Sequence, residues 1–423
     1  MRRVLIVAYW FPPDPAVGAL RPWGLYRHLL SEGWEPVVLT ASRGAEIPNI
    51  IRVPHRRPSE RLRSVLGLPL TAEGPRLPRF LAVAIRKALS LMAEATAHPD
   101  REGGWRISAV AAGSERLLGG SFDAILSTSP PSTAHLVARD LKEGTRLPWV
   151  ADLRDLWADN YDYEWSELRR WLDRRTEHDV LKSADALVTV SEPLAQRLRS
   201  LHRPATYSIP NGFASEEVAD AHHALSSRFT ITYTGTLYAG KQDPTLLFQA
   251  LADLMARGEL NAANIEVRFY GRNVDAPWLR SAAAAHGLSG NMIVGGRLPR
   301  PIALQKQRES QVLLVLDWMD ERQPGVCTGK FFEYLAAQRP ILSVGRPGGM
   351  VDTLLRETGA GRHCADVESI GSFLRESYQE FSRSGRVAYQ GDRRAIQSYD
   401  HLTMSRQFAE VLDRAASRSR SKA

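Results

Sequence analysis

Short apolar runs alternate with longer amphipathic stretches along almost the whole chain, and this alternation limits the possible folds more than any other feature. Val4–Tyr9 is the first run, the stretch from Gly18 to Leu30 suits a loop and a helix, and Glu35–Thr40 is the second run. Such alternation is typical of β-α-β units, whose strands form a parallel sheet covered by helices. The other strands that we expect are Ile51–Val53, Ala124–Ser127, Trp149–Asp152, Ala186–Val190, Thr230–Thr234, Glu266–Tyr270, Met292–Val294, Val312–Leu316 and Pro340–Val344.

The 423 residues are enough for two such sheets, because domains typically contain one or two hundred residues. A turn-rich stretch between Arg203 and Gly212 interrupts the alternation. We therefore expect one Rossmann-like domain over 1–207, rejoined by a C-terminal helix within 400–423, and a second over 208–399. Doubly wound sheets bind ligands beyond the carboxyl ends of their strands, so we expect a cleft between these ends of the two domains. The expected helices are 81–95, 168–181, 244–257, 278–286, 300–309, 331–337, 350–358, 369–398 and 403–417.

The net charge of +8 suits anionic partners such as nucleic acid, phosphorylated ligands or an acidic membrane, although a solvated basic surface explains it equally well. No basic motif interleaved with aromatic residues appears, so we expect no nucleic acid. Cys327 and Cys364 are too few for a disulfide framework or a zinc site, which indicates a cytoplasmic protein. The N-terminal apolar run stops at Pro12 without a cleavage site and suits a buried strand better than a signal peptide. No run approaches the roughly 20 apolar residues of a membrane span.

Six segments, spread in order over nearly the whole chain, carry a resemblance to a known family. They are Tyr9-Trp10-Phe11-Pro12-Pro13-Asp14 through Gly18 and Arg21, Leu29-Leu30 through Gly33 to Thr40, Asp152-Leu153-Arg154-Asp155-Leu156-Trp157, Ile209-Pro210-Asn211-Gly212, Tyr233-Thr234-Gly235-Thr236-Leu237 and Gly329-Lys330-Phe331-Phe332-Glu333-Tyr334-Leu335-Ala336. Together they resemble the family 4 retaining glycosyltransferases with the GT-B fold. The resemblance implies two Rossmann-like domains and transfer of a sugar, with retention, from a nucleoside-diphosphate donor. It also implies a glycan or lipid-linked acceptor, a role in cell-surface polysaccharide or glycoconjugate synthesis, and no metal or cofactor.

The two phosphates of such a donor need positive charge, which GT-B enzymes supply from helix N-termini and basic side chains. The family pattern Gly-Arg-x-x-x-x-Lys-Gly is matched by Gly235 and Lys241, whereas Thr236 stands where arginine is usual. One charge is therefore missing, and three other cations could replace it. These are Lys330, Arg272 and Arg297.

Glu333 matches the second of two glutamates that the family places eight positions apart around the donor sugar and ribose. Its implied role is to bind ribose hydroxyls; a favourable charge at a helix N-terminus is the alternative. Residue 325 is glycine, so the first glutamate is absent, and Asp320 or Glu321 would replace it at the wrong spacing. Backbone N–H groups of Val326, Cys327, Thr328 and Gly329 could hold the sugar instead.

The N-terminal half offers candidates for the catalytic and acceptor side. Gly18 would let the backbone approach the diphosphate or the acceptor closely, and Arg21 could face the cleft. Asp152, Arg154 and Asp155 follow a strand, where Arg154 would need a carboxylate partner such as Asp152 or Asp155. This group would form an acceptor or donor-sugar site, or an internal ion pair. His135 lies after Ser129-Pro130-Pro131, where the family presents polar groups to the acceptor, although a lone histidine also suits packing.

No pair of carboxylates with the roughly 5 Å spacing of retaining glycosidases is recognisable. We therefore expect a same-face displacement in which the leaving diphosphate takes the acceptor's proton while Lys241 and Lys330 stabilise its charge. A nucleotide-sugar epimerase of the same fold and a noncatalytic nucleotide-sugar-binding subunit remain alternatives, and a nucleic-acid binder rests on the charge alone. An arginine-bearing segment could meet anionic lipid at the inner face of the membrane. It carries Arg52, Arg56, Arg57, Arg61 and Arg63.

Overall fold

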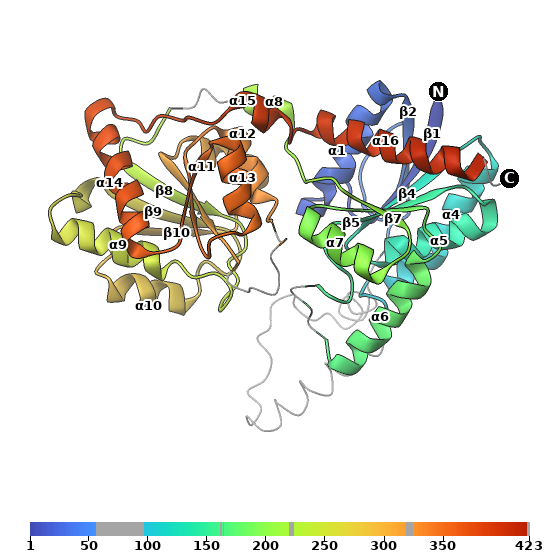
Figure 1. Cartoon of the computed structure of the whole chain (residues 1–423), viewed down its shortest axis with the longest axis horizontal. Helices are drawn as coiled ribbons and strands as arrows, with labels where there is room; N and C mark the ends of the chain where they lie inside the picture. Colours follow the sequence, from blue (N-terminus) through green and yellow to red (C-terminus); the bar gives the residue numbers. More distant parts are fainter. Residues whose placement is uncertain are drawn as a thin grey trace. The chain divides into compact units, whose positions relative to one another are not determined.

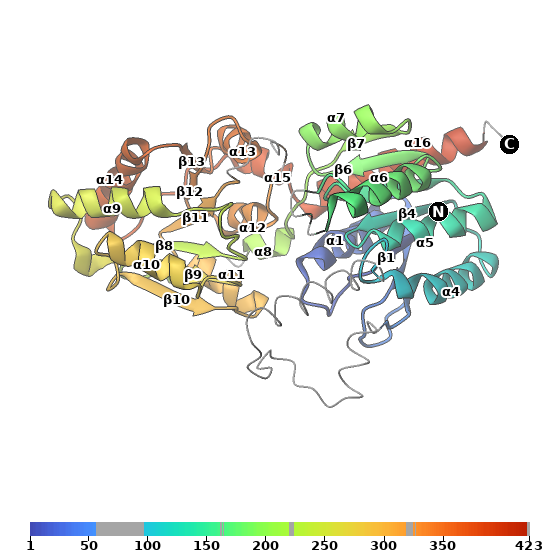
Figure 2. The same cartoon turned by 90° about the horizontal axis from the view of Figure 1, so that it is seen from below.

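The computed structural model describes residues 1–55, 97–160, 163, 165–219, 224–318, 325 and 327–420. The chain forms two compact α/β units, one of Met1–Ile209 with Ser405–Ala423 and the other of Pro210–Met404 (Figures 1 and 2). Several predicted features lie outside the described residues. They are the helix 81–95, four of the segment's five arginines (Arg56, Arg57, Arg61 and Arg63), and Asp320, Glu321 and Val326.

The first unit contains a seven-stranded sheet in which all neighbouring strands are parallel. Its order is β3-β2-β1-β4-β5-β6-β7, so the direction of winding reverses between β1 and β4. Such a reversal separates the loops that follow the two strands and leaves a crevice at their carboxyl ends. The strands are β1 Arg2–Ala8, β2 Trp34–Thr40, β3 Ile50–Arg52, β4 Ala124–Ser129, β5 Trp149–Leu153, β6 Ala186–Thr189 and β7 Ala205–Ser208.

Both faces of this sheet are buried, as the alternation along β1 shows. Leu5 and Val7 belong to the core that includes residues of α4, α5 and α6, whereas Val4 and Ile6 point to the opposite face and are also fully buried. Helices α1 and α16 lie side by side (Figure 1), where Ser405 donates a hydrogen bond to the Gly24 carbonyl. The helices are α1 Leu20–His28, α4 Arg106–Leu118, α5 Thr133–Thr145, α6 Glu167–Leu181, α7 Glu192–Leu201 and α16 His401–Arg420, with short 3-10 helices at Val17–Ala19, Leu29–Glu32 and Gly103–Trp105.

The second unit repeats this plan with six parallel strands in the order β10-β9-β8-β11-β12-β13, which reverses between β8 and β11. Along β11, Leu314 packs into the core with α9, α10 and α14, and Leu313 packs into the core with α12 and α13. The strands are β8 Phe229–Thr234, β9 Ile265–Tyr270, β10 Met292–Gly296, β11 Val312–Leu316, β12 Ile341–Val344 and β13 Gly361–Cys364. The helices are α8 Ser215–Ala219, α9 Thr245–Ala256, α10 Pro277–Ala285, α11 Arg300–Arg308, α12 Lys330–Ala337, α13 Met350–Thr358, α14 Val367–Ser384 and α15 Arg393–Gln397, with a 3-10 helix at Ala262–Asn264.

The two parallel sheets confirm the predicted α/β class, but three local expectations are wrong. β7 forms inside the stretch expected to be turns, and β13 was not expected as a strand; both are edge strands of mixed polarity, which an apolar-run criterion misses. The run 369–398 is two helices, because Gly385 adopts φ +72° and ends α14 before α15 begins.

Among the described residues, no helix is both long enough and apolar enough to cross a membrane.

Replacing Phe408 on α16 measures how much the packing of the C-terminal helix contributes to the stability of the first unit. Its side chain is fully buried, and the guanidinium carbon of Arg21 lies 4.8 Å from its ring centroid. We expect Phe408→Ala to lower the free energy of unfolding by about 3–5 kcal/mol, because it leaves a cavity. The exposed Glu410 on the same helix provides the control, and Glu410→Ala should change stability by less than about 0.5 kcal/mol. Urea unfolding measures both, and equal effects would contradict the packing role.

Candidate functional site

In the second unit, a glycine follows β8 at the point where the strand order reverses. Gly235 has φ +118°, and a Cβ placed on it would lie 3.0 Å from the Lys330 Cε and 3.2 Å from its Nζ. A Cβ on Gly271, which follows β9, would lie 1.8 Å from the Gly235 carbonyl oxygen. Because neither glycine has a side chain, the backbones at 235 and 271 can pack against each other, and the Lys330 side chain can approach the backbone of Gly235.

Lys330 begins α12, and its ammonium lies over an aromatic ring. The Nζ lies 3.8 Å from the Tyr233 ring centroid and donates a 2.5 Å hydrogen bond to the Tyr233 hydroxyl. Burial lowers the pKa of Lys330 to about 7, and the nearby Glu333 carboxylate opposes this shift. At neutral pH this lysine is therefore poised to gain a proton when an anion arrives.

Glu333 lies one turn further along α12 and has two polar partners. Its Oε1 is 3.2 Å from the Arg300 Nε, and its Oε2 accepts a 3.3 Å hydrogen bond from the Gln307 Nε2. Burial raises the pKa of Glu333, while Arg300 and Gln307 lower it. A carboxylate offers about four acceptor positions, so these partners leave room for ribose hydroxyls.

Arg300 and Gln307 were not predicted from the sequence. Arg300 also forms a 2.6 Å ion pair with Glu217, and Gln307 donates a 2.9 Å hydrogen bond to the Thr234 hydroxyl. Both lie on α11, about thirty residues before Glu333 in the chain. Only the position of Arg300 at the start of a predicted helix could have drawn attention to it, because nothing local indicates a partner so distant in sequence.

The structure brings some of the other predicted donor residues to this cluster. Thr328 and Gly329 directly precede Lys330, no side chain caps α12, and the Thr328 hydroxyl oxygen is buried without a hydrogen-bond partner. The Thr236 carbonyl accepts a 2.6 Å hydrogen bond from the Tyr233 hydroxyl, which places Thr236 beside the same tyrosine.

The remaining predicted cations have other surroundings. The Lys241 Nζ lies 5.3 Å from the Trp318 ring centroid. Trp318 follows β11, the strand that lies next to β8 on the other side of the reversal point. The Arg272 side chain is exposed, and its carbonyl accepts a 3.0 Å hydrogen bond from the Leu237 N–H. Arg297 is exposed beyond the end of the edge strand β10. Of the predicted cations, Lys330 is therefore the one in contact with Gly235.

In the first unit, Asp152, one of the two carboxylates expected beside Arg154, forms its hydrogen-bonded ion pair with Arg21 instead. Asp152 is fully buried and accepts hydrogen bonds from the Arg21 Nε at 2.9 Å and Nη2 at 3.0 Å, and from the Thr128 hydroxyl at 2.7 Å. Arg21 also donates to the Ile209 carbonyl at 2.9 Å. The bidentate geometry belongs to Arg21 because α1 places its guanidinium beside the end of β5.

Arg154 instead holds three loop carbonyls. It donates to the carbonyls of Ser129 at 2.6 Å, Gly18 at 2.8 Å and Pro130 at 3.1 Å. A Cβ on Gly18 would lie 3.2 Å from both terminal nitrogens of Arg154, so this glycine makes room for the arginine. Burial lowers the pKa of Arg154, while Asp152 and then Asp155 raise it. Gly18, Arg154 and Asp155 thus come together, with Arg154 joining the loops after β1 and β4.

His135 is inside the unit rather than on its surface. It is fully buried in α5, its Nδ1 lies 2.8 Å from the Ser127 hydroxyl, and that hydroxyl accepts a 2.7 Å hydrogen bond from the Trp149 indole. Burial lowers the pKa of His135 to about 4, so the ring is neutral at pH 7. These contacts fix the ring inside the unit, and its buried Nε2 has no hydrogen-bond partner among the described residues.

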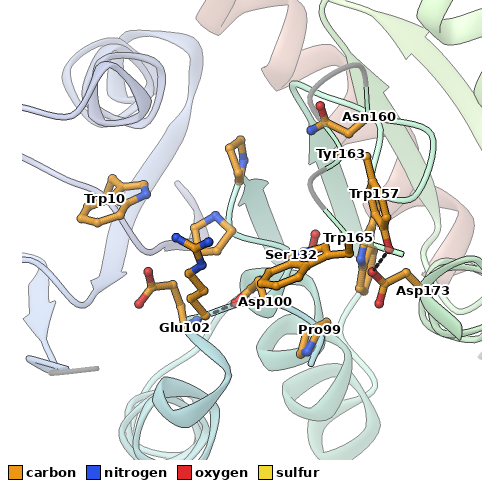
Figure 3. A pocket seen from close by; sticks show the side chains of 13 residues that line it. Trp10, Pro99, Asp100, Glu102, Ser132, Trp157, Asn160, Tyr163, Trp165 and Asp173 are labelled. Carbon is orange, nitrogen blue, oxygen red and sulfur yellow. Dashed lines mark hydrogen bonds between the residues drawn. The ribbon is translucent and has the colours of Figure 1, made fainter. Parts of the chain in front are cut away.

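A cavity of about 330 Å³ opens at the carboxyl ends of β1, β4 and β5 of the first unit. In Figure 3, Trp10 lies on one side of it, and Trp157 and Tyr163 lie on the opposite side. None of the predicted catalytic residues lines it, although Arg154 holds the carbonyl of its lining residue Pro130. Sequence reasoning missed this cavity. Its lining residues are Trp10, Pro99, Asp100, Arg101, Glu102, Pro130, Pro131, Ser132, Trp157, Asn160, Tyr163, Trp165 and Asp173.

Metal ligands are not clustered in the described part of the chain, where no group of three or more His, Cys, Asp or Glu side chains could hold an ion.

Arg52 of the basic segment donates to the carbonyls of Pro12, Ser42 and Ala45 and so helps to hold the loop after β1.

The buried Arg21–Asp152 pair allows a test of the first unit's loop anchoring. We expect Asp152→Asn to lower the free energy of unfolding by about 3–5 kcal/mol, because it leaves the Arg21 guanidinium buried without its carboxylate. Combining it with Arg21→Gln should cost clearly less than the sum of the single changes. Asp179→Asn breaks an exposed pair with Lys182 and should have a much smaller effect. Thermal and urea unfolding measure these changes, and additive losses would contradict the coupling.

The lowered pKa of Lys330 predicts a pH-dependent stability difference. The unfolded chain binds a proton at Lys330 up to about pH 10.5, and the folded chain releases it above about pH 7. Lys330 therefore destabilises the fold most below pH 7, and this cost declines as the pH rises from 7 to 10.5. We expect Lys330→Met to be more stable than the parent at pH 6 and the gap to narrow by pH 9. A gap that is constant over this range, measured by urea unfolding, would contradict the shift.

Comparison with known proteins agrees with this architecture. Residues 19–212 match the family model of the glycosyl transferase 4-like domain. A comparison with curated proteins gives no match. Among solved structures, sucrose-phosphate synthase from Thermosynechococcus elongatus is similar with a TM-score of 0.61 and 15% identity, covering 98% of this chain and 99% of that one.

Two further solved structures are similar along their whole length. HepE from Anabaena, in complex with UDP and glucose, has a TM-score of 0.60 and 13% identity, covering 98% of this chain and all of that one. The N-terminal domain of trehalose-6-phosphate phosphatase from Candida albicans has a TM-score of 0.62 and 12% identity, covering 98% and 97%. At these identities the likeness establishes the fold alone. The chain therefore has the GT-B fold, and its residues 19–212 match the glycosyl transferase 4-like domain.

Proposed function

We propose that this protein is a glycosyltransferase whose second unit binds a nucleoside-diphosphate sugar and whose first unit binds the acceptor. The observation that carries the proposal is the Lys330 ammonium lying on Gly235 at the reversal point of the second sheet, with Glu333 one turn along the same helix. Ligands of doubly wound sheets bind at this point, and a diphosphate needs a cation there. The family match supports the reaction class, and the solved HepE complex contains UDP.

In this proposal each residue of the cluster has a separate role. Lys330 neutralises the diphosphate, Glu333 binds ribose hydroxyls while Arg300 and Gln307 hold its carboxylate, and Lys241 approaches from the loop after β8. Thr328 and Gly329 face the sugar through a hydroxyl and backbone N–H groups. Arg272 and Arg297, whose side chains are exposed, contribute long-range positive charge.

We propose that the sugar is transferred with retention by same-face displacement. The acceptor hydroxyl attacks the anomeric carbon as the bond to the diphosphate breaks, and the leaving phosphate oxygen takes the hydroxyl proton. Lys330 stabilises the negative charge that grows on the diphosphate, so positioning and electrostatics would supply most of the rate enhancement. Asp152, Arg154 and Asp155 would contribute by holding the loops of the first unit in place.

A screen of donors tests the donor class. Binding to the native state raises the melting temperature, so UDP-, GDP-, ADP- and dTDP-sugars can be ranked by thermal shift. We expect one nucleotide series to stabilise the parent chain, Lys330→Gln to remove the shift, and Lys306→Gln to keep it, because Lys306 is paired with Glu309. If no series shifts the parent, or if Lys330→Gln binds as well as the parent, the donor site is wrong.

Proton uptake gives a sharper test of Lys330. The two phosphates of a nucleoside-diphosphate sugar are both esterified and do not titrate near pH 7, whereas Lys330 is largely neutral at pH 8. Binding should raise the pKa of Lys330 and take up nearly one proton. Calorimetry at pH 8 in two buffers of different ionisation enthalpy measures this uptake. Lys330→Arg should bind with no uptake, and unchanged uptake in that variant would contradict the assignment.

Turnover separates the proposal from its alternatives. Incubation with the donor alone should release little free sugar and no isomerised donor, whereas an epimerase would interconvert the donor without an acceptor. Adding glycan and lipid-linked acceptors should give a transferred product with the donor's anomeric configuration. Donor binding without turnover on any acceptor would instead indicate a noncatalytic nucleotide-sugar-binding subunit.

A lipid-linked acceptor would bring the protein to the inner face of a membrane. Flotation with anionic and neutral liposomes tests this contact, and equal flotation with both would count against binding of the protein to anionic lipid.

A further inference from the structure

The cavity of the first unit combines flat aromatic side chains with carboxylates. Trp10 follows β1, Trp157, Tyr163 and Trp165 belong to the segment between β5 and α6, and the acidic groups come from other elements. In Figure 3, Trp10 and the Trp157–Tyr163 side lie on opposite sides of the cavity. The volume of about 330 Å³ suits a small ring-shaped ligand.

The wall that contains Trp165 is held by a buried arginine. Arg169 on α6 is 3% exposed, its guanidinium carbon lies 5.4 Å from the Trp165 ring centroid, and its Nε donates a 2.9 Å hydrogen bond to Asp173. The same guanidinium donates to the carbonyls of Ala97 at 2.6 Å and Pro99 at 3.1 Å. The Arg169 side chain thus holds the segment before α4 and the segment before α6 together, which fixes this wall of the cavity.

The acidic groups are also held in place. Asp100 accepts hydrogen bonds from the Thr133 N–H at 2.7 Å and the Thr133 hydroxyl at 2.6 Å. Glu102 accepts one from the Tyr9 hydroxyl at 2.7 Å, and Asp173 accepts one from the Tyr163 hydroxyl at 2.6 Å. These partners orient the carboxylates, and carboxylate oxygens that line the cavity can accept hydrogen bonds from hydroxyl groups.

The charge of the lining decides which ligand fits. Asp173 is paired with the buried Arg169, so the lining leaves two carboxylates, Asp100 and Glu102, against the guanidinium of Arg101. A phosphate group would meet net repulsion here, in contrast to the Lys330 cluster of the second unit. A neutral sugar ring fits both features, because its C–H face packs on aromatic rings and its hydroxyls donate to carboxylates.

We propose that this cavity binds an uncharged sugar ring, so that the acceptor presents a neutral glycosyl unit here and its phosphate groups, if any, stay outside. This inference rests on the proposed function, since it names the class of acceptor. The excess of carboxylates in the lining distinguishes this cavity from the proposed donor site, where a cation faces the diphosphate.

Direct binding to the full chain tests the ligand class. Saturation-transfer NMR with neutral methyl pyranosides and with the matching sugar 1-phosphates compares the two charges on one ring. We expect the glycosides to bind and the phosphates to bind at least about tenfold more weakly. Glu102→Gln should narrow this difference, since it removes one negative charge while its side-chain carbonyl can still accept from Tyr9. Equal or tighter binding of the phosphates, or binding of simple amines in place of glycosides, would overturn the proposal.

Matched tryptophan variants locate the binding site. Trp165 lines the cavity, whereas Trp171 is 56% exposed on α6 outside the lining. We expect Trp165→Ala to weaken glycoside binding about tenfold and Trp171→Ala to leave it unchanged. Ser132→Phe should weaken binding by narrowing the cavity at the N-cap of α5, and it replaces Trp165→Ala if that variant unfolds. Equal losses in the Trp171 and Trp165 variants, or none in Trp165→Ala and Ser132→Phe, would overturn the assignment.

The outcomes also separate the cavity from the proposed function. If glycosides bind but no nucleotide sugar does, the proposed glycosyltransferase activity fails and the cavity assignment stands. If a nucleotide sugar binds with Lys330-dependent proton uptake but glycosides do not bind, only the cavity assignment fails.

Discussion

The proposed donor site depends on the close approach of Lys330 to Gly235, which the absence of a Cβ at residue 235 favours. A side chain at 235 would approach the lysine to 3.0 Å, and one at 271 would meet the Gly235 carbonyl. The reversal of strand order between β8 and β11 opens the edge of the sheet where these loops lie. Backbone geometry therefore creates the space, and α12 brings a cation into it together with Glu333.

The two units use buried charge in different ways. In the second unit the ammonium of Lys330 is kept where burial lowers its pKa to about 7, a cost to stability that an arriving anion would remove. In the first unit, Arg21 donates hydrogen bonds to Asp152, and Arg154 donates hydrogen bonds to loop carbonyls. The charges of the first unit therefore fix loops, and the cavity beside them is lined with more acidic than basic groups. A cationic site in one unit and an acidic, aromatic cavity in the other suit two ligands of different charge.

Much of the fold was accessible from the sequence, because buried parallel strands are continuous apolar runs and can be found without partners. The errors fall where that reason fails. β7 and β13 are edge strands of mixed polarity, and the break at Gly385 depends on a left-handed residue that a helical pattern hides. For the candidate site, Gly235, Lys330 and Glu333 could be named from local motifs. Arg300 could not, because its ion pair with Glu333 joins two helices through the folding of the second sheet.

The sequence alone determined the α/β class and the chemistry available at each strand end, since periodicity and motif spacing are local properties of the chain. Tertiary structure decided which charges meet. It gave Asp152 to Arg21 instead of Arg154, buried His135 beside Trp149, and assembled the cavity from segments between Trp10 and Asp173. The physical reason is that hydrogen bonds and ion pairs act over a few ångströms, so the pairing follows distances in space that no spacing along the chain encodes.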